Sequence, residues 1–351
     1  MKKNETKIDP NVKKHLLELF PEELETIILQ LGEKRFRSKQ ILNWIYQNRE
    51  IDFEKMLTLS VDLRSKLAKY FENQLPGIKE KKLSQDGTTK YLLELSDGKF
   101  IEMVLIPAGE KNTLCISSQV GCARKCKFCA TATLGFSRNL EVQEIVGQIW
   151  LAIKELNDSK LTNIVFMGMG EPLDNLESVL KAIQILQRDE CFSFSPRRIT
   201  ISTCGVIPGI RKLADSGIKV KLAVSLNSAI QEKREELMPV TKHYPLAELK
   251  NALLDFRKKT AFRITFEYVM IKDFNMRRED IKALLFYLGD ISCKLNIIKW
   301  NEVVNLPYKS PNEKEVKEFV QAISKLSFAV THRKSRGADI EAACGQLAGK
   351  Y

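Results

Sequence analysis

The chain has 351 residues, of which 44% are hydrophobic and 28% are charged, a composition that excludes collagen-like, low-complexity and wholly disordered proteins. The 56 lysine and arginine residues outnumber the 44 aspartate and glutamate residues, and the net charge of +12 favours polyanionic partners such as nucleic acid, although a basic protein without such a partner has the same composition. No apolar run approaches the ~20 residues of a membrane span, and the charged start at residues 1–14 is unlike a signal peptide, so we expect a cytoplasmic protein that does not bind membranes.

Apolar residues at helical spacing predict helices in residues 1–90, which we interpret as a helical accessory domain. Pro21 and Asp62 stand where helices are expected to begin, and Pro76-Gly77 is expected to end the last helix. The predicted helices cover residues 15–20, 23–31, 38–48 and 60–75. A β-hairpin with a Ser-Asp-Gly turn is predicted over residues 88–107.

From about residue 112, short apolar strands alternate with helical patterns such as residues 142–156 and 176–187. This alternation is typical of a parallel sheet, and six or seven strand–helix units predict an α/β fold with a full or partial barrel within residues 91–351. The predicted strands cover residues 113–118, 163–168, 198–203, 220–226, 263–270, 294–300 and 328–333. The last residues, 338–351, are a tail rich in small side chains.

Eight cysteines in a chain without a signal peptide indicate a reducing compartment, where cysteines serve metal binding or catalysis more often than structural disulfides. Cys122, Cys126 and Cys129 form a C-x3-C-x2-C pattern. A zinc ion usually takes four ligands, and Cys115 is a candidate for the fourth. Three thiolates are better suited to one [4Fe–4S] cluster with an open iron that binds S-adenosylmethionine (SAM). The pattern, with Phe128 before its last cysteine, is typical of radical-SAM enzymes.

Glycine and polar residues follow the ends of several predicted strands. The segment MGMGEP (167–172) lacks the third glycine of a dinucleotide-binding turn and the Gly-Lys of a P-loop, so we interpret it as a SAM-binding turn rather than a phosphate loop. Barrel enzymes carry their sites at the C-terminal ends of strands, although each such residue alone is commonly a turn or cap residue. The resulting cofactor-binding candidates are Gly170, Glu171, Ser202, Ser225, Leu226, Asn227 and Asn301.

Together these motifs resemble the RlmN/Cfr family of radical-SAM RNA methyltransferases over nearly the whole chain. The segments that carry the resemblance are FRSKQILNWIY (36–46), FIEMVLIP (100–107), TLCISSQVGCARKCKFCATATLGFSRNL (113–140), FMGMGEPLDN (166–175), ITISTCGVIPGI (199–210), AVSLN (223–227), RITFEY (263–268) and GADIEAACGQLAGKY (337–351). The segments MGMGEPL and GFSRNL are more similar to the RlmN branch of the family than to the Cfr branch. The family usually has histidine where Asn227 stands and proline where Lys299 stands.

The resemblance implies a partial radical-SAM barrel that methylates adenine C2 in 23S rRNA, at the peptidyl transferase centre, and in tRNA next to the anticodon. It implies two SAM molecules per turnover. Cys344 takes a methyl group from the first, and a radical derived from the second activates that methyl group for addition to C2. Cys115 then releases the product through a transient disulfide with Cys344. The resemblance also implies an RNA-binding role for residues 1–90 and an electron donor such as flavodoxin or ferredoxin, and we expect a monomer.

Glu102 is a further catalytic candidate. It shares one face of its predicted strand with Phe100, Val104 and Ile106, where a desolvated carboxylate would have a raised pKa suited to proton transfer. The family position implies a proton acceptor, Cys115 is a second candidate for taking the C2 proton, and an exposed glutamate on an edge strand is the structural alternative.

RNA contacts are expected from basic clusters at residues 79–82, 124–125, 197–198 and 333–336. Three other functions stay open on the sequence alone. They are Cfr-like methylation of C8 of the same rRNA adenine, a radical-SAM enzyme with a small-molecule or protein substrate, and a zinc-containing RNA-binding protein without enzymatic activity.

Overall fold

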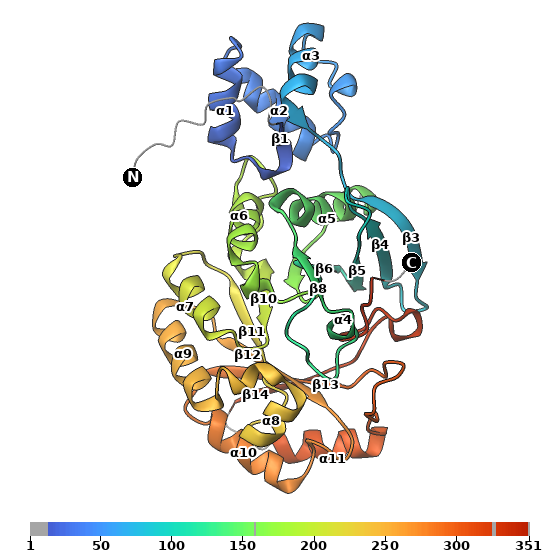
Figure 1. Cartoon of the computed structure of the whole chain (residues 1–351), viewed down its shortest axis with the longest axis vertical. Coiled ribbons are helices and arrows are strands. Elements are labelled where there is room, and N and C mark those ends of the chain that lie inside the picture. The colour runs from blue at the N-terminus through green and yellow to red at the C-terminus, as the bar shows by residue number, and fades with distance from the viewer. Residues whose placement is uncertain (1–12, 158, 325–327, 350–351) are drawn as a thin grey trace.

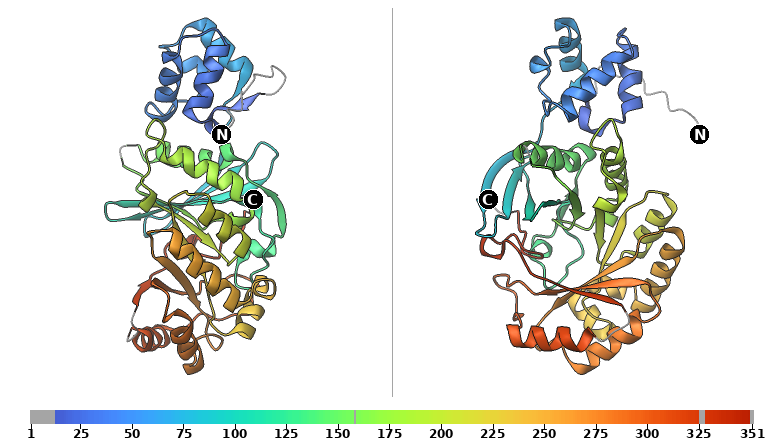
Figure 2. Two further views of the ribbon diagram at one scale, coloured as in Figure 1. Left: turned by 90° about the vertical axis from the view of Figure 1, so that its left-hand side faces the viewer. Right: turned by 180° about the vertical axis from the view of Figure 1, so that it is seen from behind.

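The computed structural model describes residues 13–157, 159–324 and 328–349, so most of the charged segment at residues 1–14, which is unlike a signal peptide, lies outside the described residues. A small helical unit stands at one end of the long axis, and a larger unit built on a curved sheet makes up the rest (Figures 1 and 2). None of the helices in this part of the chain combines the length and apolarity that crossing a bilayer requires.

Three amphipathic α-helices build the helical unit. Pro21 occupies the first position of the first helix, and the backbone N–H of Phe20 donates to the Glu23 side chain at 2.8 Å. Ser60 caps the third helix by accepting the N–H of Leu63 at 3.2 Å. With 3-10 helices labelled η, the elements are β1 (Lys14–His15), η1 (Leu16–Glu18), α1 (Pro21–Gln30), α2 (Phe36–Tyr46), η2 (Phe53–Lys55), α3 (Val61–Tyr70) and β2 (Phe71–Glu72).

Two of the helix predictions in this unit are wrong, the one over residues 15–20 throughout and the one over residues 60–75 at its C-terminal end. Residues 15–20 form β1 and a 3-10 turn rather than an α-helix, because Phe20 precedes a proline and its backbone is extended, with φ −73° and ψ 153°. The helix predicted to reach residue 75 ends at Tyr70, because Phe71 is buried in the core and its strand pairs in parallel with β1.

The larger unit contains a ten-stranded sheet in the described residues, ordered β14-β13-β12-β11-β10-β9-β6-β5-β4-β3. Neighbours from β6 to β14 run parallel, and neighbours from β3 to β6 run antiparallel. Within the described ranges β3 and β14 are the two edges of the sheet and do not pair with each other, so the α/β fold is a partial barrel, as predicted. The strands are β3 (Gly77–Leu83), β4 (Thr89–Glu94), β5 (Phe100–Ala108), β6 (Lys111–Cys115), β9 (Asn163–Phe166), β10 (Ile199–Thr203), β11 (Lys221–Ser225), β12 (Ile264–Met270), β13 (Cys293–Lys299) and β14 (Ala329–Arg333).

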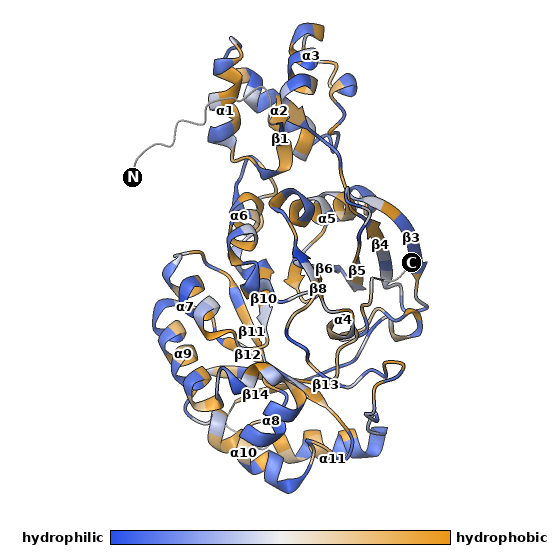
Figure 3. Cartoon of the chain, in the orientation of Figure 1, coloured by the Kyte–Doolittle hydropathy of each residue, from blue (hydrophilic) through white to orange (hydrophobic). Residues whose placement is uncertain are grey.

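Most of the helices lie along the outer side of the curved sheet (Figure 1). Hydrophobic colour follows the central strands in Figure 3, and the surrounding helices show both colours, as amphipathic helices do when one face packs on a sheet. The helices are α4 (Ala130–Thr133), α5 (Val142–Glu155), α6 (Leu176–Gln187), α7 (Ile207–Asp215), α8 (Gln231–Leu237), α9 (Leu246–Lys259), α10 (Arg278–Leu288) and α11 (Glu313–Ile323). The remaining elements are β7 (Gln119–Gly121), β8 (Phe136–Asn139), η3 (Pro172–Asp174), η4 (Pro196–Arg198), η5 (Pro239–Lys242) and η6 (Ala338–Ile340).

The helical unit rests on the outer helices of the sheet. The indole N–H of Trp150 in α5 donates to the carbonyl of Ile45 at 2.8 Å, and the rings of Tyr46 and Phe192 are 4.8 Å apart. Strand β3 lies within the range 1–90 of the expected accessory domain, yet it pairs with β4 at the edge of the large sheet. The chain therefore leaves the helical unit between β2 and β3.

Candidate active site

Two neighbouring cavities on the inner face of the sheet share Cys344. Their volumes are about 990 Å³ and about 160 Å³, and Met167, Ile298 and Cys344 line both. Alternate residues of a strand supply the walls, as Thr113 and Cys115 of β6 do, because side chains two positions apart point to the same face. The sheet thus directs residues from distant parts of the sequence toward one place.

Cys122, Cys126 and Cys129 line the smaller cavity. They lie on the loop between β7 and α4, which is fixed at both ends. The Cys122 N–H donates to the carbonyl of Gly135 at 2.7 Å, and the Lys127 N–H donates to a carbonyl at the end of α8 at 2.9 Å. Cys115 lies in the larger cavity instead, so the structure does not support it as a fourth zinc ligand beside these three.

The three thiols suit a thiophilic, positively charged group. Burial raises the pKa of Cys122 to about 12, and it also raises the pKa values of Cys126 and Cys129. Charge on the other two cysteines raises the pKa of Cys126 further, so thiolates form here only when a cation balances them. Within the described residues, no three Cys, His, Asp or Glu side chains already converge as the ligands of one metal ion do.

The turn after β9 brings Gly170 and Glu171 to the wall of the smaller cavity. Gly170 has a φ of +99°, and a Cβ there would lie 2.5 Å from the Cβ of Gln119, so the position requires glycine. The Gln119 side chain accepts the Glu171 N–H at 2.9 Å. The Glu171 carboxylate accepts the N–H groups of Leu173 at 3.1 Å and Cys204 at 2.8 Å, while burial raises its pKa.

The remaining strand-end candidates divide into two groups. Ser202 at the end of β10 and Ser225 at the end of β11 line the smaller cavity. Leu226 is fully buried and does not line the smaller cavity. Asn227 also lies outside this cavity, and its Oδ1 accepts the backbone N–H of Val269 at 2.9 Å. Asn227 also has a φ of +56°, a left-handed conformation that asparagine tolerates. These two residues shape the turn after β11.

Glu267 of β12 lines the smaller cavity, and sequence reasoning missed it. One carboxylate oxygen accepts from Asn296 at 3.0 Å, and the other is buried without a hydrogen-bond partner among the described residues. Burial raises the pKa of Glu267, while the charge of Arg333 opposes the shift. The available signal in the sequence was a glutamate within the apolar strand RITFEYVM. In the structure, a buried carboxylate oxygen without a protein partner points to a ligand.

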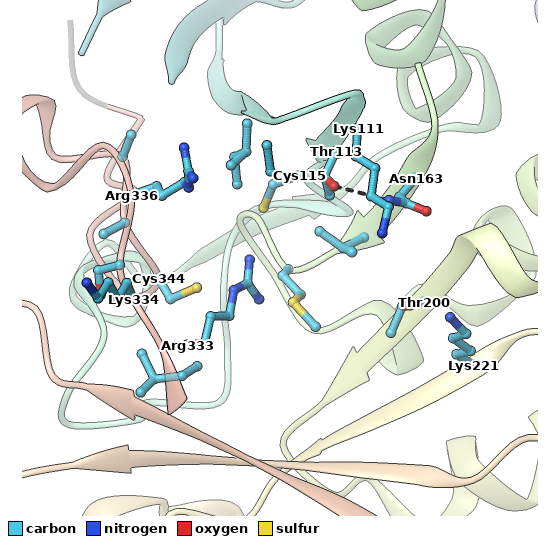
Figure 4. A pocket seen from close by; sticks show the side chains of 18 of the residues that line it. Lys111, Thr113, Cys115, Asn163, Thr200, Lys221, Arg333, Lys334, Arg336 and Cys344 are labelled. Atoms are coloured by element: carbon cyan, nitrogen blue, oxygen red, sulfur yellow. Dashed lines mark hydrogen bonds between the residues drawn. The ribbon is translucent and has the colours of Figure 1, made fainter. Parts of the chain in front are cut away.

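Cys115 and Cys344 both line the larger cavity, and their sulfur atoms are directed into the same space beside Arg333 (Figure 4). Both thiols are free. Burial raises the pKa of Cys115 to about 12, with Cys344 adding to the shift and Arg333 opposing it. Surrounding protein also raises the pKa of Cys344, although its side chain is exposed in the cavity, and Arg333 again opposes the shift. The guanidinium therefore favours the thiolate form of both cysteines.

The larger cavity is strongly basic, and none of the described residues that line it is acidic. Its basic lining residues are Lys111, Arg197, Arg198, Lys221, Arg333, Lys334 and Arg336. None of these seven forms an ion pair with a described residue, whereas Lys81 and Lys82 of β3 pair with Glu155 and Glu80. The charge of the cavity is thus uncompensated, unlike that of the cluster at 79–82. Sequence reasoning missed Lys111 and Lys221, which stand at the starts of strands.

Glu102 and Asn301 lie outside the linings of the two cavities and contact the tail instead. The Glu102 side chain is buried, pairs with Lys90 at 3.1 Å and accepts the N–H groups of Ala348 and Gly349. The side-chain amide of Asn301 donates to the carbonyl of Cys344 at 3.1 Å. Both residues therefore act on the segment that carries Cys344.

A partial barrel with three cysteines on the loop after β7 is typical of radical-SAM enzymes. The Radical SAM superfamily model matches residues 116–285, and the cofactors of that superfamily are SAM and a [4Fe–4S] cluster. A model of the ribosomal RNA large subunit methyltransferase N-terminal domain matches residues 14–72. The chain belongs to the RlmN family of radical-SAM RNA methyltransferases, which confirms the resemblance found in the sequence.

Similar proteins cover nearly the whole chain. The probable dual-specificity RNA methyltransferase RlmN of Dictyoglomus turgidum is 42% identical over 332 residues, which are 94% of this chain and 95% of that protein. The dual-specificity RNA methyltransferase RlmN of Geobacter sulfurreducens is 44% identical over 94% of this chain and 90% of that protein. The crystal structure of a radical SAM methyltransferase from Sphaerobacter thermophilus matches with a TM-score of 0.93 and 37% identity, covering 96% of this chain and 100% of that one.

Proposed function

We propose that this enzyme methylates C2 of adenine in 23S rRNA, at the peptidyl transferase centre, and in tRNA next to the anticodon, through a methylated Cys344 and with two SAM molecules per turnover. The observation that carries the proposal is the position of Cys344, which lines both the cysteine-rich cavity and the basic cavity that holds Cys115. A group accepted by Cys344 from the smaller cavity is already at the wall of the larger one.

Methylation of the target atom, adenine C2, calls for a carbon radical. Adenine C2 lies between two ring nitrogens and is electron-poor, so it does not attack a methyl donor as a nucleophile. The cluster and SAM together supply a carbon radical when bound, with Cys122, Cys126 and Cys129 as the cluster ligands. Gly170, Glu171, Ser202 and Ser225 line the space for SAM, and the unpartnered oxygen of Glu267 offers it a hydrogen-bond acceptor.

The two outlying cysteines have successive roles. Cys344 attacks the methyl group as a thiolate, a form that Arg333 favours. After the carbon joins C2, the Cys115 sulfur attacks the Cys344 sulfur, and the S–S bond forms as the bond from Cys344 to the carbon breaks. The electron pair of the broken bond stays with the nucleotide carbon, which takes up a proton to become the methyl group. The unpaired electron left by the radical addition would pass to the bound cluster, and cellular thiols then reduce the disulfide. Cys115 lines the cavity whereas both oxygens of Glu102 already have partners, which favours Cys115 as the group that takes the C2 proton.

The basic cavity is the proposed entry for RNA. Its uncompensated charges suit phosphates, and the helical unit at residues 13–72 is the proposed accessory RNA-binding domain. We further propose a monomer that acts on its RNA in the cytoplasm and receives electrons from a donor such as flavodoxin or ferredoxin. C8 methylation of the rRNA adenine is the second candidate, since the radical chemistry is the same and the choice rests on the RlmN kinship of the chain.

The test is anaerobic turnover of the reconstituted enzyme on 23S rRNA fragments and tRNA, followed by nucleoside mass spectrometry. We expect 2-methyladenosine from both RNAs. A dominant 8-methyladenosine signal would favour the second candidate, and methylation of only one RNA would remove the other from the proposal.

The cysteine roles have their own test. Cys115→Ala should still accept a methyl group on Cys344 and add to adenine, but it cannot form the disulfide. A covalent protein–RNA adduct should therefore accumulate, seen as a slow-migrating, nuclease-sensitive band. The band should be absent when Cys344 is also replaced by alanine. Normal turnover of Cys115→Ala without an adduct would move the resolving role to another group.

A further inference from the structure

Cys344 lies in a segment that has little regular structure of its own. Within the described part of residues 337–349, the 3-10 turn Ala338–Ile340 is the only regular element. Such a segment opens easily unless other parts of the protein bond to its backbone. The position of Cys344 therefore depends on what holds the chain on either side of it.

A carboxylate is one of the groups that hold the segment C-terminal to Cys344. Glu102 on β5 accepts the N–H of Ala348 at 2.7 Å and the N–H of Gly349 at 3.1 Å, both through the same oxygen. A Cβ on Gly349 would lie 2.8 Å from the Cε of Met169 and 3.1 Å from the carbonyl oxygen of Phe100, so the tail is seated closely at this point.

One ammonium group holds the near side and fixes the carboxylate as well. The Nζ of Lys90 on β4 lies 3.1 Å from the other oxygen of Glu102 and donates to the carbonyl of Glu341 at 3.2 Å. Lys90 is 8% exposed and Glu102 is 4% exposed. A buried pair of this kind thus contacts the tail at residues 341 and 348–349, on both sides of Cys344.

We propose that Lys90 and Glu102 form a latch that holds the tail so that Cys344 stays at the wall shared by the two cavities. Glu102 is then a positioning residue, which accepts tail N–H groups, and Lys90 is its partner. The role of Cys344 in this inference rests on the proposed function, while the latch itself rests on the contacts of the tail.

The first test compares Glu102→Ala and Lys90→Met with the wild type, each reconstituted with iron and sulfide. Hydrogen–deuterium exchange in peptides spanning residues 338–349 should become at least tenfold faster, while peptides of α1 and α2 stay unchanged. SAM-dependent methylation of Cys344, followed by mass spectrometry without RNA, should slow at least tenfold. Unchanged exchange of the tail in both variants would overturn the latch.

A matched control is available in Lys233, whose ammonium pairs with buried Asp280 at 2.9 Å beside α10. Lys233→Met also breaks a partly buried ion pair, but it should alter neither tail exchange nor Cys344 methylation. The double variant Lys90→Met with Glu102→Leu guards against misfolding, since replacing a buried ion pair by apolar residues is often tolerated. Its tail should exchange as fast as that of Glu102→Ala, and a protected tail in this variant would count against the proposal.

The charge swap Lys90→Glu with Glu102→Lys separates a latch from a simple ion pair. It keeps opposite charges side by side, yet it turns an ammonium toward the N–H donors of Ala348 and Gly349. We expect no recovery of tail protection, and full recovery would show that the ion pair alone matters. Glu102→Gln addresses the proton-acceptor role, because the amide oxygen still accepts the tail N–H groups. Normal tail exchange and normal Cys344 methylation with loss of methylated RNA alone would overturn the assignment of Glu102 as a positioning residue. If wild-type Cys344 is never methylated while tail exchange responds as expected, the proposed function fails and the latch stands.

Discussion

Arg333 is the residue that links the chemistry of the two outlying cysteines. It ends β14, lines the larger cavity and opposes the upward pKa shifts of both Cys115 and Cys344. A fixed positive charge near a thiol favours the thiolate, which is the reactive form.

Arg333→Leu should therefore raise the pKa values of both thiols and lower the thiolate fraction at any given pH below them. Because one pKa unit is a tenfold change in that fraction, alkylation of exposed Cys344 by iodoacetamide at pH 8 should slow about three- to tenfold. Its pH profile should move to higher pH. Arg336→Leu removes a charge from the same cavity that is not among the main causes of either pKa shift, so it should move the profile much less. Equal shifts in both variants would contradict the assignment.

The three loop cysteines permit a second prediction at this scale. Cys126→Ser should abolish the iron content and all SAM cleavage after anaerobic reconstitution, because the cluster loses one of its ligands. Cys293→Ser, at the buried start of β13, should keep the iron. Iron and absorbance measurements decide it, and retained iron with full SAM cleavage in Cys126→Ser would count against the cluster site.

At the scale of elements, the turn between β9 and α6 shows how backbone and side chain are coupled. Gly170 approaches Gln119, whose side chain holds the backbone of Glu171. The hairpin turn between β4 and β5 provides a comparison, since Gly98 has a φ of +76° but an added Cβ there would meet nothing within 4 Å.

Gly98→Ala should cost only the strain of a left-handed alanine, about 1–2 kcal/mol in the free energy of unfolding. Gly170→Ala should cost about 1–3 kcal/mol more, because the Cβ also displaces Gln119. Urea unfolding measures both losses. SAM binding should be weakened in Gly170→Ala alone, and equal effects of the two variants would refute the coupling.

Local sequence patterns predicted most helices and strands well, but they did not predict which distant residues meet in one cavity. The parallel strands and the Ser-Asp-Gly hairpin were predictable because alternation and turn residues act over a few positions. The helix at 15–20 failed because Pro21, a residue beyond it, decides the backbone of Phe20. The union of Arg333, Lys111 and Lys221 in one cavity depends on which strands are neighbours, and one sequence does not display that.

At the scale of the whole molecule, charge is distributed unevenly. The basic residues of the larger cavity have no ion-pair partner among the described residues, whereas Lys81 and Lys82 at the sheet edge are paired. The excess positive charge of the chain, +12 in total, is therefore left uncompensated in the larger cavity, where it can attract phosphates.

Arg197→Gln with Arg198→Gln should weaken RNA binding at low salt at least tenfold. It should also reduce the slope of log K against log salt by about 1–2, because each lost phosphate contact lowers it by roughly one. Lys81→Gln with Lys82→Gln changes the net charge by the same amount and should leave the slope nearly unaltered. Fluorescence anisotropy over a salt series gives both slopes, and the reverse pattern would place the RNA at the sheet edge.

The shared wall at Cys344 has a consequence for inhibition. A compound that fills only the smaller cavity should be competitive toward SAM and noncompetitive toward RNA, since Met167, Ile298 and Cys344 are the only described residues that line both cavities. A polyanion bound in the larger cavity should show the opposite pattern. A molecule that reaches past Cys344 into both cavities would compete with each substrate, and its affinity would gain from the linkage of two binding groups.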